Sequence, residues 1–187
     1  MTSKATYFTA AGDDGTTALF GQTGRVPKYS LRPEAYGSID EAQAALGVLR
    51  AGDCQPRTKE LVLRVERDLY LMMSQLATAN DAPLTARPID QRDIAWLEAA
   101  TTEIGGFTGS FTDFVLPGDT LSGAQTHLAR TIIRRAERKV AKLCHAKDLK
   151  NPFILKYLNR LSSLLFVLAL YEDRHGGVAS PTYAKDI

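Results

Sequence analysis

Residues 130–138 read Arg-Thr-Ile-Ile-Arg-Arg-Ala-Glu-Arg and belong to a longer amphipathic segment. At helical spacing, Arg130, Arg134 and Glu137 share one stripe, and Arg138 lies beside it. A second stripe is apolar and consists of Leu128, Ile132, Ala136, Val140 and Leu143. The pattern predicts a helix with one face in a core and one densely cationic face that carries a single carboxylate.

The cationic face has two interpretations. Guanidinium groups bind carboxylates and phosphates through paired hydrogen bonds, so the face could hold an anion. Most runs of charge, however, are solvated faces of surface helices. Taken alone, residues 130–138 favour the solvated face.

Four further segments have apolar residues at helical spacing. With the basic helix included, the expected ranges are about 33–52, 58–79, 88–105, 119–147 and 151–176. Pro88 suits the first turn of the third helix, and Gly105-Gly106 are expected to stop that helix. Short connections and the lack of an alternating strand pattern predict an all-α five-helix bundle.

The remaining segments lack periodicity. Residues 1–30 are predicted to form an irregular loop rich in Gly and Thr, and residues 177–187 an irregular tail. We expect one domain over 1–187, with the bundle spanning 31–176.

Composition excludes several classes of protein. Apolar residues make up 44% and charged residues 24%, as in ordinary globular proteins. A net charge of +2 argues against a general binder of nucleic acid or anionic membranes. We expect no membrane span, because no apolar run approaches about 20 residues. The start of the chain lacks the apolar core of a secretion signal, and Cys54 and Cys144 form no metal pattern, so we expect a cytoplasmic protein.

Three other segments contain residues that could form a site. Glu172 and His175 have Glu-x-x-His spacing, but a di-iron bundle needs two such motifs, so we expect no direct metal site. Cys144 and His145 are adjacent on a helix and point apart, which argues against a nucleophilic dyad. Phe114 either plugs the end of the bundle or forms an apolar wall for a planar ligand, and composition favours the plug.

The N-terminal loop carries Gly12-Asp13-Asp14-Gly15-Thr16-Thr17, and Lys28 follows. Glycines allow backbone amides to converge on an anion, and Thr and Lys add donors and charge. The loop lacks the Gly-Lys-Ser/Thr ending of a Walker A motif. By itself it is more typical of a turn.

Four blocks in order resemble the PduO-type ATP:cob(I)alamin adenosyltransferases over about residues 6–175. They are the glycine loop with Lys28, Gly37-Ser38-Ile39-Asp40-Glu41, Phe114-Val115-Leu116-Pro117-Gly118 running into 130–138, and Tyr157-Leu158-Asn159-Arg160-Leu161-Ser162. The resemblance implies a homotrimer of five-helix bundles with active sites between subunits. It also implies transfer of the 5′-deoxyadenosyl group of MgATP to cobalt(I) of a corrinoid, which gives adenosylcobalamin and triphosphate. A reductase and an adenosylcobalamin-dependent enzyme are the protein partners to be expected.

The resemblance also implies roles for individual residues. Arg134, Glu137 and Arg138 would be catalytic, with Glu137 near Mg²⁺ through water, and Phe114 would occupy the lower face of the corrin. Asp40 and Arg130 would pair across the subunit interface. The residues expected to bind ATP are Thr9, Gly12, Asp13, Gly15, Thr16, Thr17, Lys28, Arg134, Glu137, Arg138 and Asn159.

The chain departs from the family pattern at Ala10, Ala11, Asp119, Ser163 and Leu170. The family commonly has a glycine where Asp119 stands, a basic or hydroxyl residue at Ala10 and a small polar residue at Ala11. The alanines motivate an alternative: a catalytically weakened trimer that binds ATP or a corrinoid.

Overall fold

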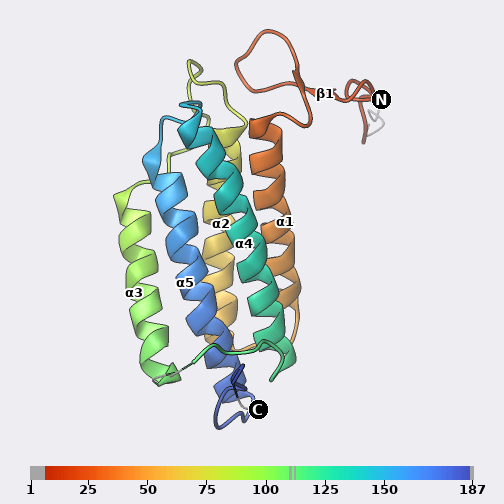
Figure 1. Ribbon diagram of the computed structural model, residues 1–187. Coiled ribbons are helices and arrows are strands. Elements are labelled where there is room, and N and C mark those ends of the chain that lie inside the picture. Colours follow the sequence, from red (N-terminus) through yellow and green to blue (C-terminus); the bar gives the residue numbers. More distant parts are fainter. Residues whose placement is uncertain (1–6, 110, 112, 186–187) are drawn as a thin grey trace, which may run out of the picture.

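Five helices run side by side along one axis, and a small hairpin lies beyond one end of them (Figure 1). The computed structural model describes residues 7–109, 111 and 113–185. Within this part the elements are β1 (Thr16–Thr17), β2 (Val26–Pro27), α1 (Leu31–Ala51), α2 (Pro56–Leu76), α3 (Gln91–Thr108), α4 (Leu121–His145) and α5 (Pro152–His175). The prediction of a five-helix all-α bundle is confirmed.

Helix α5 forms the centre of the bundle. It packs between α3 and α4 and also touches α2, while α1 packs against α2 and α4 (Figure 1). Its side chains Leu161, Leu164, Leu165 and Leu168 are buried in the common core. Among the described helices, α5 alone is long and apolar enough to cross a membrane by length and composition, and 50% of its apolar window is buried by its neighbours. That burial is typical of a core helix.

Helix α4 buries most of its predicted apolar stripe. Ile132, Ala136, Val140 and Leu143 all lie in the core. Leu128 does not: it is 59% exposed, and the prediction that it faces the core is wrong. Ala129 and Ile133 are fully buried instead, so the buried strip runs one position further round the helix.

Capping sets the start of α3 differently from the sequence expectation. The Asp90 side chain accepts a hydrogen bond from the backbone N–H of Arg92 at 2.8 Å, and Asp93 accepts one from the N–H of Asp90 at 3.0 Å. This capping box starts the helix at Gln91 rather than at Pro88.

The end of α3 was also predicted wrongly. The helix continues through Gly105-Gly106 to Thr108 and ends where Gly109 takes φ 73°. Ile104 is fully buried beside the two glycines. Tertiary packing of this turn overrides the weak helix propensity of glycine.

The N-terminal loop contains a hairpin that the sequence did not predict. Thr16 and Thr17 pair antiparallel with Pro27 and Val26. Strands of two residues are too short to show an alternating pattern. The hairpin projects beyond the end of the bundle, and Phe20 attaches the loop to the chain just after α2 through backbone hydrogen bonds of 2.8 and 2.9 Å (Figure 1).

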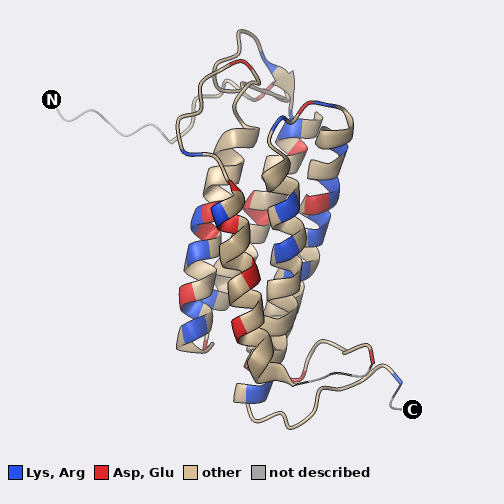
Figure 2. Cartoon of the chain, turned by 90° about the vertical axis from the view of Figure 1, so that its left-hand side faces the viewer, with Lys and Arg blue, Asp and Glu red and all other residues tan. Residues whose placement is uncertain are grey.

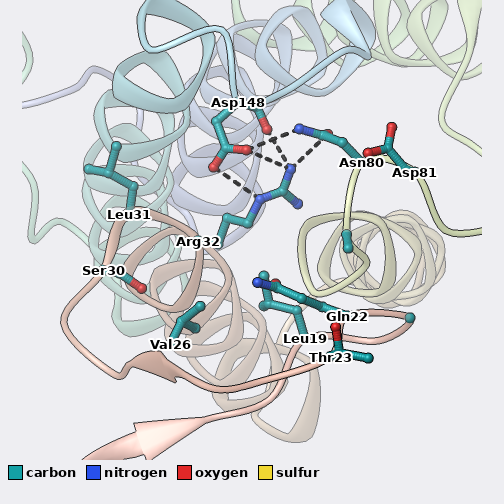
Figure 3. Close-up of a pocket in the computed structure, with 12 residues that line it drawn as sticks. Leu19, Gln22, Thr23, Val26, Ser30, Leu31, Arg32, Asn80, Asp81 and Asp148 are labelled. Carbon is teal, nitrogen blue, oxygen red and sulfur yellow. Dashed lines mark hydrogen bonds and ion pairs between the residues drawn. The ribbon is translucent and has the colours of Figure 1, made fainter.

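Arg32, in the first turn of α1, joins three elements at this end (Figure 3). Its Nη1 donates to the backbone carbonyls of Leu76 and Thr78 at 3.0 and 2.8 Å. Its Nη2 donates to Asn80 Oδ1 at 2.8 Å, and its Nε donates to Asp148 Oδ2 at 3.0 Å. The guanidinium therefore holds α1 to the end of α2 and to the turn before α5.

We predict that Arg32→Ala destabilises the protein by about 3 kcal/mol, because it leaves buried carbonyls and a carboxylate without their donor. Urea denaturation followed by circular dichroism measures the change. The control is Arg67→Ala, which removes an exposed arginine and should change stability by less than about 0.5 kcal/mol. Equal effects of the two substitutions would contradict a structural role for Arg32.

Candidate functional site

The outer face of α4 carries two unpaired arginines. Arg134 and Arg138 are exposed, and neither forms a hydrogen bond or ion pair with any other described residue. Figure 2 shows Lys and Arg interleaved with Asp and Glu along the helices. Free guanidinium groups on a regular helix are available to an external anion.

The flank of the same helix is used differently. Arg135 forms an ion pair with Glu41, and Lys139 forms one with Glu34, both on α1. Hydrogen bonding to Lys139 holds the pKa of the Glu34 carboxyl below its ordinary value. The basic residues of α4 therefore form two groups. Arg135 and Lys139 form a flank that binds α1, and Arg134 and Arg138 form a free outer stripe.

Glu137 and Asn159 lie together beside the free stripe. Asn159 Nδ2 donates to Glu137 Oε1 at 3.0 Å, and Arg160 Nη1 donates to Asn159 Oδ1 at 3.0 Å. Arg160 Nε in turn donates to Glu98 Oε1 on α3 at 3.0 Å. This chain of contacts orients the amide and the carboxylate, and it brings together two residues that are far apart in the sequence.

The glycine loop is closed by Lys28. Its Nζ donates to the carbonyl oxygen of Gly12 at 2.7 Å, and its backbone N–H donates to the carbonyl of Gly15 at 2.9 Å. A Cβ atom at Gly12 would lie 3.0 Å from that Nζ, so a side chain there would push the lysine away. Gly15 has φ 79°, a conformation that favours glycine.

Thr16 is the centre of the hairpin's side-chain contacts. Asp14 Oδ1 accepts from the Thr16 N–H at 2.9 Å and from its hydroxyl at 2.7 Å, and these bonds lower the pKa of Asp14. Arg25 Nε donates to Thr16 Oγ1 at 2.6 Å. No motif in the sequence marks Arg25, because only the hairpin brings it to Thr16. Thr9, Asp13 and Thr17 lie in the same loop.

The loop and the basic helix do not meet within one chain. In the described residues, no hydrogen bond or ion pair joins residues 7–28 to α4 or to Asn159. The loop projects from the end of the bundle, whereas Arg134 lies midway along α4 (Figure 1). Likewise, no ion pair of the described chain joins Asp40 to Arg130. One chain therefore holds two separated halves of the predicted site.

Phe114 and Arg130 share a cavity at the other end of the bundle. The cavity measures about 670 Å³ and is lined by Phe111, Asp113, Phe114, Val115, His127, Arg130, Phe166 and Lys185. Phe111 packs edge-on against Phe166 with ring centres 5.1 Å apart. Phe114 is 81% exposed, so its interpretation as a plug is wrong. Its ring lies open to a ligand at the rim of an aromatic wall.

His127 also lines this cavity, although it was not among the predicted site residues. It lies one turn before Arg130 on the same stripe and is 2% exposed. Arg130 Nε donates to His127 Nδ1 at 3.4 Å, which leaves the proton of a neutral ring on Nε2, where no described group accepts it. Burial and then the charge of Arg130 lower the pKa of His127 to about 4. Burial and Arg134 lower the pKa of Arg130 as well.

The depressed pKa of His127 predicts a pH-dependent stability. Between its ordinary pKa of 6.5 and the folded value of about 4, the unfolded chain binds a proton that the folded chain does not. Stability should therefore fall as the pH drops through this window. We expect the wild type to lose on the order of 2 kcal/mol more than His127→Gln between pH 7 and pH 4.5 in urea denaturation. Equal losses in both proteins would contradict the shift.

The fold and the site together define a helical bundle with a cationic helix face and an aromatic cavity. The chain belongs to the cobalamin adenosyltransferase family, whose family model matches residues 7–172.

Several relatives are similar over most of this chain. The corrinoid adenosyltransferase PduO of Citrobacter freundii is 38% identical over 168 residues, which cover 89% of this chain and 49% of that protein. The chain thus spans about half the length of that relative. The cobalamin adenosyltransferase of Cupriavidus metallidurans is 38% identical over 181 residues, covering 95% of this chain and 94% of that one.

Solved structures agree with the sequence matches. A variant of the PduO-type ATP:corrinoid adenosyltransferase from Lactobacillus reuteri, complexed with cobalamin and ATP, superposes with a TM-score of 0.86. It is 26% identical, and the match covers 96% of this chain and 99% of that chain.

Proposed function

We propose that this protein transfers the 5′-deoxyadenosyl group of ATP to the cobalt of a reduced corrinoid, giving adenosylcobalamin and triphosphate. One observation carries the proposal: in a member of this family, two unpaired arginines, Arg134 and Arg138, flank an oriented Glu137–Asn159 pair. The aromatic cavity around Phe114 supplies the second ligand's surface.

Arg134 and Arg138 would bind the triphosphate and stabilise the charge that grows as it leaves. The cobalt(I) electron pair attacks C5′, the C5′–O bond breaks, and its electrons pass to the triphosphate oxygen. Fixed guanidinium groups favour this step because they need not reorganise. Asn159 would hydrogen-bond the nucleotide.

Mg²⁺ would arrive with ATP. The described residues contain no group of three His, Cys, Asp or Glu side chains that could hold a metal ion. Triphosphate oxygens would therefore supply most ligands, and Glu137 would contact the ion through water, as hard cations with retained waters permit.

The N-terminal loop would reach the nucleotide of a neighbouring subunit in a homotrimer. The separation of the loop from α4 within one chain supports this arrangement, as does the absence of a described partner for Asp40 at Arg130. Exposed apolar side chains on α1 and α4, Val48 and Leu128 at 59% each, would be covered by such a contact.

Phe114 would lie against the lower face of the corrin. An apolar ring offers cobalt no donor atom, so it displaces an axial ligand without replacing it. Cobalt(II) with four ligands is easier to reduce to the nucleophilic cobalt(I) state. A reductase would supply that electron, and an adenosylcobalamin-dependent enzyme would use the product. Cys54 and Cys144 are both free thiols, in keeping with a cytoplasmic setting.

The loop's own contacts favour one alternative, a weakened member that binds ATP or a corrinoid with little turnover. Lys28 Nζ and the Thr16 hydroxyl are already engaged within the loop. Ala10 has φ 56°, which is strained for an alanine. Both features would lower affinity for triphosphate.

Anaerobic incubation with prereduced cobalamin and MgATP, followed by visible spectroscopy, tests the function. We expect a cobalt–carbon product from the wild type, and its absence would leave the binding alternative. Arg134→Ala should lower kcat on the order of 10²–10³-fold with an unchanged melting temperature. Lys142→Ala, which removes an exposed cation two turns further along α4, should keep full activity.

A mixing experiment tests whether the site is shared. Lys28→Ala and Arg134→Ala alter opposite halves of the proposed site. Co-refolded mixtures of the two inactive variants would contain interfaces with an intact loop from one chain and an intact helix from the other. Recovery of activity is expected, whereas mixtures as inactive as each variant alone would place both halves in one chain.

We further predict that Phe114→Ala slows turnover on a cobalt(II) corrinoid with a coupled reductant far more than turnover on prereduced cobalt(I). The ring acts before the transfer step, so the second substrate bypasses it. The measurement is the ratio of the two rates. Equal loss on both substrates would count against the ring's proposed role.

A further inference from the structure

The C-terminal tail is tied to the segment that carries Phe114. Val115 and Tyr183 form an antiparallel bridge. The N–H of Leu116 donates to the carbonyl of Thr182 at 2.8 Å, and the N–H of Ala184 donates to the carbonyl of Phe114 at 2.9 Å. Two segments far apart in the sequence thus share a short ladder beside the cavity.

Asp119 fixes the register of this ladder. Its Oδ2 accepts from the N–H of Thr182 at 2.9 Å, and its Oδ1 accepts from the Thr182 hydroxyl at 2.7 Å. Gly118 just before it has φ 131°, a conformation that favours glycine and lets the chain turn there. The Asp119 carboxylate therefore accepts hydrogen bonds from both donors of Thr182, and we call these two bonds the Asp119 grip.

Asp113 completes the arrangement on the other side of Phe114. Its Oδ1 accepts from the N–H of Phe114 at 2.7 Å, and its Oδ2 pairs with Lys185 Nζ at 2.9 Å. Both Asp113 and Lys185 line the cavity. The backbone of Phe114 is thus held at its N–H by Asp113 and at its carbonyl by the tail.

Packing cannot fix the Phe114 ring, because the side chain is 81% exposed and its segment belongs to no helix or regular strand. A ring that must press against a planar ligand needs a fixed backbone, since ordering a free segment during binding costs conformational entropy. The ladder and the Asp119 grip supply that order in advance.

We propose that Asp119 and Thr182 are positioning residues that preorganise Phe114 for the corrinoid. The inference rests on the proposed function and adds two residues to it. Asp119 binds Thr182 and is not among the residues that line the cavity, so it acts through the tail. Loss of the grip should free the tail and the Phe114 backbone while leaving the helix bundle intact.

Hydrogen–deuterium exchange of the whole protein without ligands tests the grip itself. In Asp119→Ala and in Thr182→Val, which keeps the shape but loses the hydroxyl, exchange at Leu116 and Ala184 should rise on the order of tenfold. Thr182→Ser should restore wild-type exchange. Ser180→Ala, an exposed hydroxyl in the same tail, is the matched control and should change nothing.

Activity measurements test whether the Asp119 grip positions Phe114 for the corrinoid. Asp119→Ala should lower the rate on a cobalt(II) corrinoid on the order of tenfold more than the rate on prereduced cobalt(I), with an unchanged melting temperature. The electron paramagnetic resonance signal of four-coordinate cobalt(II), recorded with ATP bound, should weaken in parallel. Thr182→Ser should retain both the rate and the signal.

Unchanged exchange in Asp119→Ala would overturn the grip. Faster exchange with an unchanged ratio of rates would overturn its role in positioning Phe114. A wild type that binds cobalamin and ATP but transfers nothing to prereduced cobalt(I) would refute the proposed function instead, and the exchange and resonance measurements would still decide whether the grip orders Phe114.

Discussion

The buried guanidinium of Arg32 is the contact on which the arrangement of the loop end depends. Helix ends leave carbonyl groups without partners, and α2 ends where the chain must turn away from the bundle. Arg32 satisfies carbonyls at this end and binds Asp148 at the same time. Because Phe20 attaches the loop to the same turn after α2, one buried cation fixes the place from which the N-terminal loop projects. Arg32 also lines a cavity of about 620 Å³ beside the loop, where its guanidinium is engaged by these contacts (Figure 3).

The basic helix shows how one charged segment can serve two purposes. Arg135 and Lys139 face α1 and form ion pairs with its carboxylates, so their charge is neutralised within the chain. Arg134 and Arg138 form no ion pair with any described residue, so their charge is available to the anion that we propose they bind. Composition alone cannot separate the two pairs, because all four residues are equally basic. The direction in which each side chain leaves the helix separates them.

Periodicity predicted most of the fold. Five helices and the buried strip of Ile132, Ala136, Val140 and Leu143 follow from spacing alone, because a core imposes a repeat on the sequence. Gly105-Gly106 and Leu128 were misjudged because tertiary contacts decide helix ends and the edge of a buried strip. The family resemblance implied that Glu137 and Asn159 both lie near the nucleotide, but it did not predict the hydrogen bond between them. Arg25 could not be found, because its partner Thr16 comes from a hairpin that the spacing does not predict. His127 lies one turn before Arg130 on the same helix stripe, and that spacing was the signal that could have marked it.

The loop projects away from the helix face that it is proposed to serve, and this has a consequence for dilute solutions. Under that proposal, a single chain carries every functional residue, but it lacks a complete site because its loop and its basic helix do not meet. Specific activity then follows the association equilibrium of the subunits, and it falls with concentration once dissociation begins. Nucleotide bound between chains would shift that equilibrium toward assembly. Bound substrate would then stabilise the assembled subunits and preserve specific activity at low protein concentration.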